Sequence, residues 1–221
     1  MLDKFRCDFI VHFYGAVFIK NKTCLVTEFA EYGSMNDLMK SRKGAKPIKK
    51  VLRYKILLDA ARGIKYLHSN DILHRDIKPD NILVVSLDEN NIVNGKLTDF
   101  GSARNVNMMM TNMTFTKGVG TPKYMSPEVL NREKYKKPAD VYTFSITMYE
   151  CIIWGDPFPK ELYPHPWDIA DNVMRGERPN TEHLSKDVQD LLSASWAQDP
   201  RQRAGIDEVV NKLEKLYNTV Q

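Results

Sequence analysis

The sequence predicts an α+β fold in which one short β-hairpin precedes a mainly helical body. Two observations support this prediction. Strand-forming β-branched and aromatic residues gather in residues 10–29, and apolar residues recur at helical spacing over much of the chain after residue 47. The chain has 221 residues, of which 43% are hydrophobic, enough to fill one core. We therefore expect one globular domain, either undivided or built from two lobes.

The first expected element is an antiparallel hairpin. Residues 10–19 (IVHFYGAVFI) and 25–29 (LVTEF) are rich in strand-forming residues, and the turn-like KNKT separates them. A helix of about 20 residues is expected to start at Pro47, because apolar residues recur at the spacing of one buried stripe. That stripe comprises Ile48, Leu52, Ile56, Ala60, Ile64 and Leu67.

Two short strands are expected after this helix. Their sequences are ILVV and KLTDF, and Asn94-Gly95 predicts a hairpin turn just before the second strand. Residues 102–121 are rich in Thr and Met and show no period. We expect a long mobile loop there.

Three helices are expected in the last third of the chain. Pro138 opens an apolar run that ends before Gly155, which predicts a helix buried on nearly every side. Two amphipathic helices are expected near residues 184–197 and 206–218. The sequence contains no repeat and no low-complexity tract.

Charge and cysteine content disfavour several classes of function. The formal net charge is +4, and 32 basic residues are interleaved with 28 acidic ones, which argues against nucleic acid as a partner. We expect no membrane segment and no signal peptide, because no apolar run reaches the roughly 18 residues of a spanning helix. Three scattered cysteines, Cys7, Cys24 and Cys151, suit a reducing compartment, so we expect a cytoplasmic protein.

A polar cluster interrupts the apolar pattern at residues 72–83 (ILHRDIKPDNIL). Pro79 prevents a helix from running through, so the charged residues belong either to a solvated turn or to a reactive site. Five residues of this segment and three that follow eighteen residues later resemble the catalytic-loop and metal-binding signatures of the protein kinase family: His74, Arg75, Asp76, Lys78, Asn81, Asp99, Phe100 and Gly101. Agreement at all eight positions by chance is expected on the order of once in 10¹⁰ placements.

The resemblance to protein kinases covers essentially the whole chain. TPKYMSPE, DVYTFSI and DPRQR resemble the end of the activation loop, the start of the central helix and the C-terminal Arg motif of that family. It implies that residues 1–30 form a remnant of the kinase N-lobe with the hinge, and residues 31–221 the mainly helical C-lobe. Isolated turns held by hydrogen bonds are the alternative, which four segments in the family's order disfavour.

The resemblance implies phosphoryl transfer with ATP and Mg²⁺ as cofactors. Asp76 would accept the proton of the substrate hydroxyl, and Lys78 would hold the γ-phosphate. Asn81 and Asp99 would bind magnesium, which prefers hard oxygen ligands. Lys78 together with Thr121 implies a protein substrate with a serine or threonine acceptor.

VTEFAEYGS, residues 26–34, resembles the hinge between the kinase lobes, although VTEF alone would also suit an edge strand. Thr27 would be the gatekeeper of the adenine pocket. The Glu28 carbonyl and the Ala30 amide would face adenine. Leu83 would pack beneath the ring.

The resemblance also implies residues for regulation and for stability. Arg75 could pair with a phosphate that an upstream kinase adds to the activation loop, where Thr114 and Thr116 are the best-placed acceptors. Glu128 and Arg203 would form a buried ion pair, and two unlinked surface residues are the alternative.

Asp140 would bond the backbone of the catalytic loop, with an ordinary Asp at a helix start as the alternative. The apolar spine of the family would comprise Leu2, Phe13, His74 and Phe100. Family members also have a Gly-rich loop, a strand Lys and a helix Glu, none of which the sequence contains. We therefore expect that the chain begins inside that helix, that its hairpin is loosely held, and that its own catalysis is very weak.

Three functions stay open at this point. The favoured one is a serine/threonine protein kinase. The second is a pseudokinase-like binding module whose helical lobe docks partners. The third is a fragment with no independent function, which would fail to unfold cooperatively.

Overall fold

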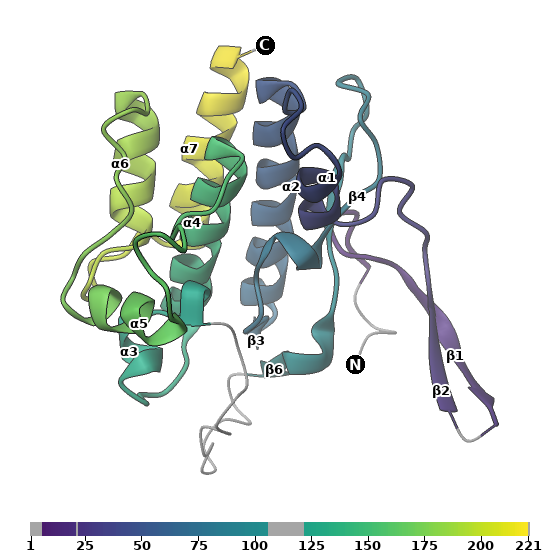
Figure 1. Cartoon of the computed structure of the whole chain (residues 1–221). Coiled ribbons are helices and arrows are strands. Elements are labelled where there is room, and N and C mark those ends of the chain that lie inside the picture. Colours follow the sequence, from purple (N-terminus) through teal and green to yellow (C-terminus); the bar gives the residue numbers. More distant parts are fainter. Residues whose placement is uncertain (1–5, 21, 106–121, 221) are drawn as a thin grey trace.

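Seven helices and three two-stranded antiparallel sheets form the part of the chain that the structure describes (Figure 1). This computed structural model describes residues 6–20, 22–105 and 122–220. The helices are α1 (Met35–Ser41), α2 (Lys50–Ser69), α3 (Pro127–Leu130), α4 (Lys137–Ile153), α5 (Pro166–Met174), α6 (Lys186–Ser195) and α7 (Ile206–Val220). The strands are β1 (Phe13–Ile19), β2 (Lys22–Thr27), β3 (Ile72–Leu73), β4 (Ile82–Val84), β5 (Gly95–Leu97) and β6 (Arg104–Asn105). The predicted α+β class is confirmed.

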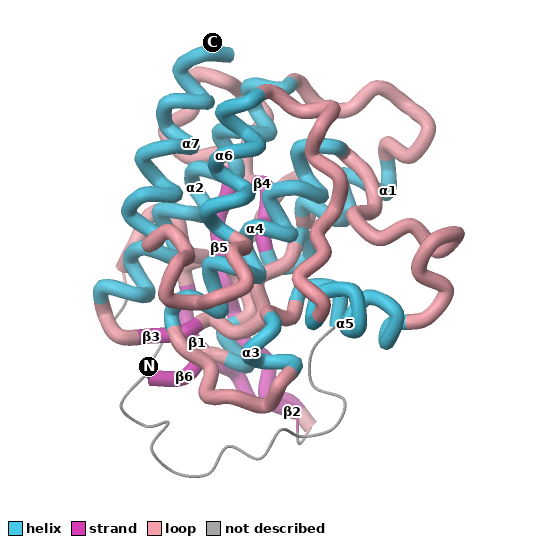
Figure 2. Tube along the Cα trace, turned by 90° about the vertical axis from the view of Figure 1, so that its left-hand side faces the viewer, coloured by secondary structure: helices cyan, strands magenta, loops and turns pink. Residues whose placement is uncertain are grey.

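The hydrophobic core lies among the long helices. α2 packs against α7, α4 and β5, and α6 packs against both α4 and α7. These four helices lie side by side with roughly aligned axes (Figure 1, Figure 2). The small sheets β3–β6 and β4–β5 follow α2 in the chain, and the polar residues of the candidate site lie in the turns next to their strands.

The β1–β2 hairpin projects from the helical body (Figure 1). Its register runs from Phe13↔Thr27 to Ile19↔Lys22, with an irregularity after Phe13. The second strand begins at Lys22, three residues earlier than expected, so the turn is tighter than the four residues KNKT. Most side chains of the hairpin are exposed on both faces, because the hairpin has no sheet neighbour among the described residues.

Helix α2 is more deeply buried than one stripe would make it. It begins at Lys50, three residues after Pro47, and all six residues of the predicted stripe are buried. Elements pack on several sides of α2, so its buried residues include the polar pair Lys55 and Asp59. Lys55 Nζ lies 2.6 Å from an Asp59 carboxylate oxygen, which satisfies both charges inside the fold.

Asn94 and Gly95 do not form the predicted hairpin turn. Gly95 is already the first residue of β5, and residues 85–94 connect it to β4. Asn94 is fully buried and its side-chain amide donates to two carbonyl groups of that connection. The backbone N–H groups of Asn94 and Gly95 donate to Asp59 Oδ2 at 2.8 and 3.3 Å. Close packing against α2, not turn geometry, therefore explains this pair of residues.

Gly95→Ala is expected to lower the free energy of unfolding by about 1–3 kcal/mol, because overpacking forces a backbone shift. A Cβ atom at Gly95 would lie 2.9 Å from Ile56 Cγ2 and 3.0 Å from the Ile56 carbonyl oxygen. The measurement is urea denaturation followed by circular dichroism. Gly15→Ala is the control, because its Cβ would meet no atom within 4 Å. Equal stability of the Gly95 variant and the parent chain would contradict this account.

The three helices expected late in the chain are present. Every residue of α4 from 139 to 151 is buried, and the helix ends at Trp154, whose φ of 55° is left-handed. Helices α6 and α7 match the two amphipathic segments within a few residues. Three further helices, α1, α3 and α5, were not predicted. α1 starts at a capping box between Ser34 and Asp37, and α5 follows Pro166.

Candidate active site

Three predicted catalytic residues meet in the turn between β3 and β4. Lys78 Nζ donates to Asp76 Oδ2 at 2.7 Å, and Asn81 Nδ2 donates to the same oxygen at 3.0 Å. Asn81 Nδ2 also donates to the Asp76 carbonyl at 2.7 Å. Pro79 opens the 3₁₀ turn that returns Asn81 to Asp76. Asp76 Oδ2 is thus held by two donors, whereas Asp76 Oδ1 accepts no hydrogen bond from the described residues.

His74 connects this turn to the strand that leads into Asp99. Its Nε2 lies 3.0 Å from the Thr98 carbonyl, and its Nδ1 lies 3.3 Å from the Asp76 N–H. Because a carbonyl only accepts, Nε2 carries the proton and Nδ1 is the acceptor. Complete burial lowers the pKa of His74 more than the carboxylates of Asp140, Asp76 and Asp99 raise it. His74 is therefore a neutral link between the two halves of the site.

Asp99 is exposed at the start of the 3₁₀ turn Phe100–Ser102. Its φ of 58° is left-handed, a conformation that Asp tolerates better than most residues. Asp99 Oδ1 accepts from the Gly101 N–H at 3.2 Å, and the Phe100 ring lies 5.4 Å from the His74 ring. The structure brings Asp76, Lys78 and Asn81 into direct contact. Asp99 lies next to them through Thr98, and no recorded hydrogen bond joins it to the three.

The donor set fits magnesium held together with nucleotide phosphates. Asn81 Oδ1 and Asp99 Oδ2 make no recorded hydrogen bond within the described part of the chain, so both oxygens are available. Among those residues, no three His, Cys, Asp or Glu side chains are arranged so that they could hold a metal ion by themselves. Mg²⁺ commonly takes one or two protein ligands and completes its shell with water and substrate phosphates. One carboxylate and one amide oxygen therefore suit it better than a closed all-protein site.

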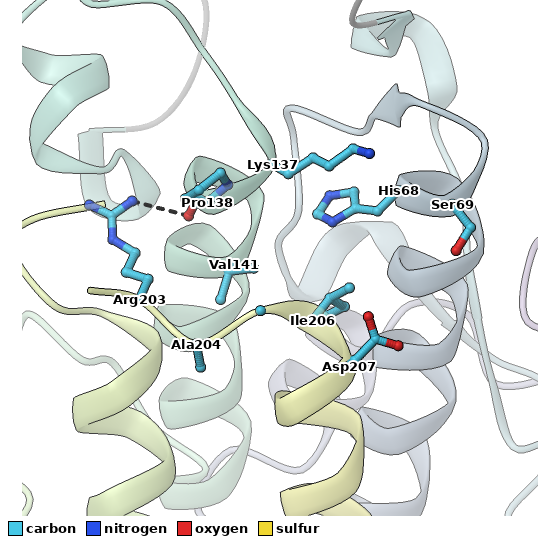
Figure 3. A pocket seen from close by; sticks show the side chains of 10 residues that line it. His68, Ser69, Lys137, Pro138, Val141, Arg203, Ala204, Ile206 and Asp207 are labelled. Carbon is cyan, nitrogen blue, oxygen red and sulfur yellow. Dashed lines mark hydrogen bonds between the residues drawn. The ribbon is translucent and has the colours of Figure 1, made fainter. Parts of the chain in front are cut away.

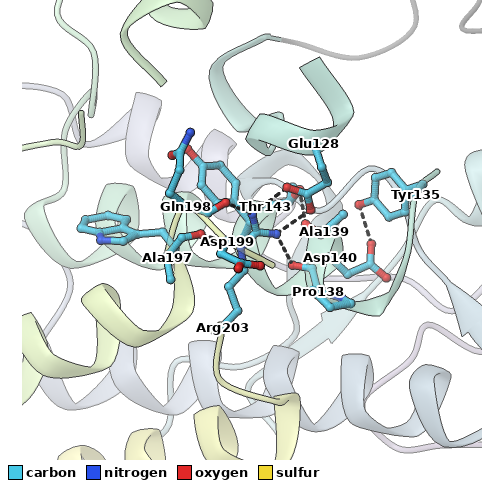
Figure 4. Close-up of polar contacts among 12 residues, drawn as sticks. Glu128, Tyr135, Pro138, Ala139, Asp140, Thr143, Ala197, Gln198, Asp199 and Arg203 are labelled. Carbon is cyan, nitrogen blue, oxygen red and sulfur yellow. Dashed lines mark hydrogen bonds and ion pairs between the residues drawn. The ribbon is translucent and has the colours of Figure 1, made fainter. Parts of the chain in front are cut away.

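Asp140, on α4, holds the backbone of the catalytic loop. Its Oδ2 accepts from the His74 N–H at 3.0 Å and lies 2.9 Å from His68 Nε2. Its Oδ1 accepts from the Arg75 N–H at 2.9 Å and from the Tyr135 hydroxyl at 2.8 Å (Figure 4). Arg75 has a φ of 71°, which costs roughly 1–2 kcal/mol for a residue with a side chain. The bond to its N–H offsets part of that strain.

The pKa of Asp140 lies below its ordinary value. Complete burial alone would raise it, but the hydrogen bonds from His68 and from the Arg75 N–H outweigh that effect. Asp140 is therefore an ionised carboxylate that only accepts. This fixes the proton on His68 Nε2, which donates to it.

Asp140→Asn is expected to lower the free energy of unfolding by about 1–3 kcal/mol at pH 7, because the amide leaves buried donors unpaired. The folded-state pKa of Asp140 is depressed, so its contribution is present above the unfolded pKa of about 3.9 and lost as pH falls through the folded value. The gap between parent and variant should shrink below that pH in urea unfolding. Asp71→Asn is the surface control. A gap that stays constant down to pH 3 would contradict the assignment.

Glu128 and Arg203 form a buried, two-pronged ion pair (Figure 4). Each Arg203 terminal nitrogen lies 2.6 Å from one Glu128 oxygen. The guanidinium also donates to the carbonyls of Pro138 and Ala197, at 3.0 and 2.9 Å. Its carbon lies 5.0 Å from the ring centre of Tyr142. The pair joins α3 to the segment that precedes α7.

The predicted adenine contacts lie where β2 leads into α1. No recorded hydrogen bond of the described residues uses the Glu28 carbonyl or the Ala30 N–H, so both can face a ligand. Thr27 is the exposed last residue of β2, and Leu83 is half-buried in β4. The Glu28 carboxylate has a role that the sequence did not reveal. Lys96 Nζ lies 2.8 Å from both of its oxygens, and residues 68 apart give no spacing signal.

A second polar cluster was missed beneath the segment 122–124. Tyr124 donates to Glu150 Oε2 and Lys123 donates to Glu150 Oε1, both at 2.7 Å. Burial raises the pKa of Glu150, which Lys123 partly offsets. The sequence signal for this cluster was the carboxylate of Glu150, which stands inside the apolar run of α4. This cluster anchors the residues that follow Thr121 to the centre of the lobe.

The remaining predicted residues are placed as follows. Leu2, Thr114, Thr116 and Thr121 lie outside the described residues, as does most of the expected mobile loop. Phe13 is half-buried at the start of β1. The Arg75 guanidinium lies 5.7 Å from the Tyr135 ring centre, and its buried Nε makes no hydrogen bond to any described residue.

Comparison with known proteins gives the class to which this fold and site belong. The protein kinase domain model matches residues 1–213. The chain therefore belongs to the protein kinase domain family, as the resemblance of its motifs predicted.

Individual relatives agree with that family. The chain is 32% identical to the probable serine/threonine-protein kinase gdt9 of Dictyostelium discoideum, over 98% of the chain and 15% of that protein. It is 31% identical to serine/threonine-protein kinase VIK and 33% identical to STY17, both of Arabidopsis thaliana. All of the chain aligns with these two, and it covers 50% and 37% of their lengths. The chain thus spans half or less of these relatives.

None of the described helices combines the length and the apolar character that crossing a bilayer requires.

Proposed function

We propose that this chain carries the catalytic site of a serine/threonine protein kinase, which transfers the γ-phosphate of ATP to a protein hydroxyl. The observation that carries the proposal is the contact of Asp76 with both Lys78 and Asn81, beside Asp99. Membership of the protein kinase family supports the reaction class. The names of the relatives support the serine/threonine acceptor.

The arrangement of Asp76 suits a general base. Lys78 and Asn81 hold Oδ2, which leaves Oδ1 to accept the proton as the substrate oxygen attacks the γ-phosphorus. The bond to the β-phosphate oxygen breaks in the same step, and ADP leaves. The Lys78 ammonium lies close enough to Asp76 to meet the charge of the transferred group.

Asn81 and Asp99 are the proposed ligands of magnesium, and Thr27, Glu28, Ala30 and Leu83 the proposed surroundings of adenine. Magnesium held by these residues would neutralise the charge of the nucleotide phosphates. The division into a hinge-side part up to about residue 30 and a helical lobe after it belongs to the same proposal.

Regulation and location are proposed on less direct grounds. Arg75 would respond to phosphorylation of Thr114 or Thr116 by an upstream kinase, and its partly unsatisfied guanidinium supports that role. A cytoplasmic location is supported by Cys7, Cys24 and Cys151, all of which are free thiols.

The acceptor class has a direct test. The chain is incubated with Mg-ATP and a generic basic protein, and the phosphorylated residues are identified by mass spectrometry. We expect phosphate on serine and threonine only, and none when Asp99→Asn replaces the parent chain. Phosphotyrosine as the main product would overturn the acceptor class, and equal phosphorylation by the Asp99 variant would overturn the site.

One observation favours a second function, a pseudokinase-like binding module. The hairpin and the segment that follows it expose large apolar side chains, including Phe18 at 81% and Phe29 at 89%, and such surfaces often mark interaction sites. Calorimetric titration with Mg-ATP separates the two functions. Binding that Asp99→Asn abolishes favours the kinase, and no heat of binding at millimolar nucleotide favours the module. Unfolding without a cooperative transition would instead favour a fragment that has no function of its own.

A further inference from the structure

A cavity of about 380 Å³ lies away from the catalytic cluster. It opens where the C-terminal end of α2, the N-terminal end of α4 and the segment leading into α7 meet (Figure 3). This volume is within the range of small-molecule sites, roughly 300–1,000 Å³. None of the residues in the proposed reaction lines it.

The lining of the cavity has an apolar part, beside which lie the polar side chains of His68, Ser69, Lys137, Arg203 and Asp207. Pro138, Val141, Ala204 and Ile206 supply the apolar lining. His68 is 5% exposed, and its ring extends from α2 into the space between α4 and the start of α7 (Figure 3). A planar apolar group could therefore pack against the lining while touching a single buried polar group.

The charged residues of the lining already have partners. Arg203 donates to Glu128 and to backbone carbonyls. Lys137 Nζ lies 2.7 Å from Asp71, and Asp207 lies 2.7 Å from Lys65 Nζ. These pairs leave no uncompensated charge on the lining, so the cavity favours a neutral ligand.

His68 presents an acceptor to this space. Its Nε2 donates to the Asp140 carboxylate at 2.9 Å, and in the neutral form of such a ring the lone pair lies on Nδ1. Nδ1 makes no hydrogen bond that the structure records among the described residues. A ligand that places an N–H or O–H there would satisfy it.

We propose that this cavity is a second binding site, which takes a small neutral aromatic molecule carrying one N–H or O–H donor. The aromatic ring packs on Pro138, Val141, Ala204 and Ile206, and the donor bonds His68 Nδ1. The site goes beyond the proposed kinase activity and does not depend on it.

Occupancy of this site is linked to the catalytic loop by a short path. Asp140 Oδ2 accepts from both His68 Nε2 and the His74 N–H, and Asp140 Oδ1 accepts from the Arg75 N–H. A hydrogen bond donated to His68 Nδ1 polarises the ring and strengthens the bond that Nε2 donates to Asp140. The amide signals of His74 and Arg75 should therefore respond to the ligand.

The test is a two-dimensional ¹H–¹⁵N NMR titration of the whole chain with indole, and in parallel with 1-methylindole, which lacks the donor. A ligand of this size should bind with a dissociation constant of about 1–10 mM. We expect saturable shifts at residues 68–69, 137–141 and 204–207 and at the His74 and Arg75 amides. Loss of one hydrogen bond should weaken 1-methylindole about fivefold.

Gly205 offers a matched pair of variants. It lines the cavity, and a Cβ there would meet no atom within 4 Å. Gly205→Leu should fill the space and weaken indole binding at least tenfold. Gly205→Ala makes the same change to the start of α7 but leaves the space, so it should bind indole as the parent chain does.

Each outcome decides the proposal. Weaker binding of 1-methylindole, with loss only in Gly205→Leu, supports it. Equal affinity for the two indoles overturns the role of His68. Shifts that persist in Gly205→Leu, or that fall outside the cavity residues, overturn the site. Because the readout is binding, these results do not depend on whether the chain phosphorylates a substrate.

Discussion

Asp76→Asn is expected to lower the rate of phosphoryl transfer by about 10²- to 10⁴-fold, the usual contribution of a general base. An amide oxygen can still accept from Lys78 and Asn81, so the turn should keep its shape. What the variant lacks is a carboxylate to take the hydroxyl proton. The measurement is incorporation of labelled phosphate into a generic basic protein at saturating Mg-ATP.

Asp88→Asn is the matched control for that experiment. Asp88 is exposed in the connection between β4 and β5, and its Oδ1 accepts from the Asn90 N–H, a bond that an amide oxygen can keep. Its rate should equal that of the parent chain. If Asp76→Asn transferred phosphate as fast as this control, Asp76 would not be the base. A circular dichroism spectrum of each variant separates loss of chemistry from loss of folding.

Arg203→Ala is expected to lower the free energy of unfolding by about 3–5 kcal/mol, because it leaves the buried Glu128 carboxylate unpaired. For a domain of this size the midpoint of thermal unfolding should fall by about 6–20 °C. The measurement is differential scanning calorimetry, with urea denaturation as a second method.

Arg201→Ala provides the comparison, because Arg201 pairs with Asp199 at the surface and its side chain is 89% exposed. Its loss should cost less than about 1 kcal/mol. Adding Glu128→Gln to Arg203→Ala should cost much less than the sum of the two single changes, since it removes the unpaired charge. Additive effects would mean that the two side chains do not depend on each other.

Much of this fold could be predicted from the sequence because its strongest signals are local. The apolar run of α4 allows few structures other than a buried helix. The periodic apolar residues of α7 show which face of that helix is buried. The motif around Asp76 and the later segment at Asp99 identified the residues of the candidate site. Their proximity needed the fold, since His74 and Asn81 bond the backbone of Thr98, next to Asp99, where β4 pairs with β5.

The contacts that the sequence did not reveal lie where distant segments meet. Asn94-Gly95 has the composition of a tight turn, but the buried Asp59 carboxylate takes both of its N–H groups. Glu28 was given only a backbone role, although its side chain binds Lys96. Neither contact leaves a mark in local composition, because each depends on a partner dozens of residues away.

The four donors gathered on Asp140 have a consequence for protein engineering. The loop from Leu73 to Asp76 cannot be transplanted as a short peptide insert, because its backbone path relies on a carboxylate from another helix. A chimaera that borrows these residues must also borrow the first turn of α4. Sequence segments separated by about sixty-five positions thus behave as one exchangeable module.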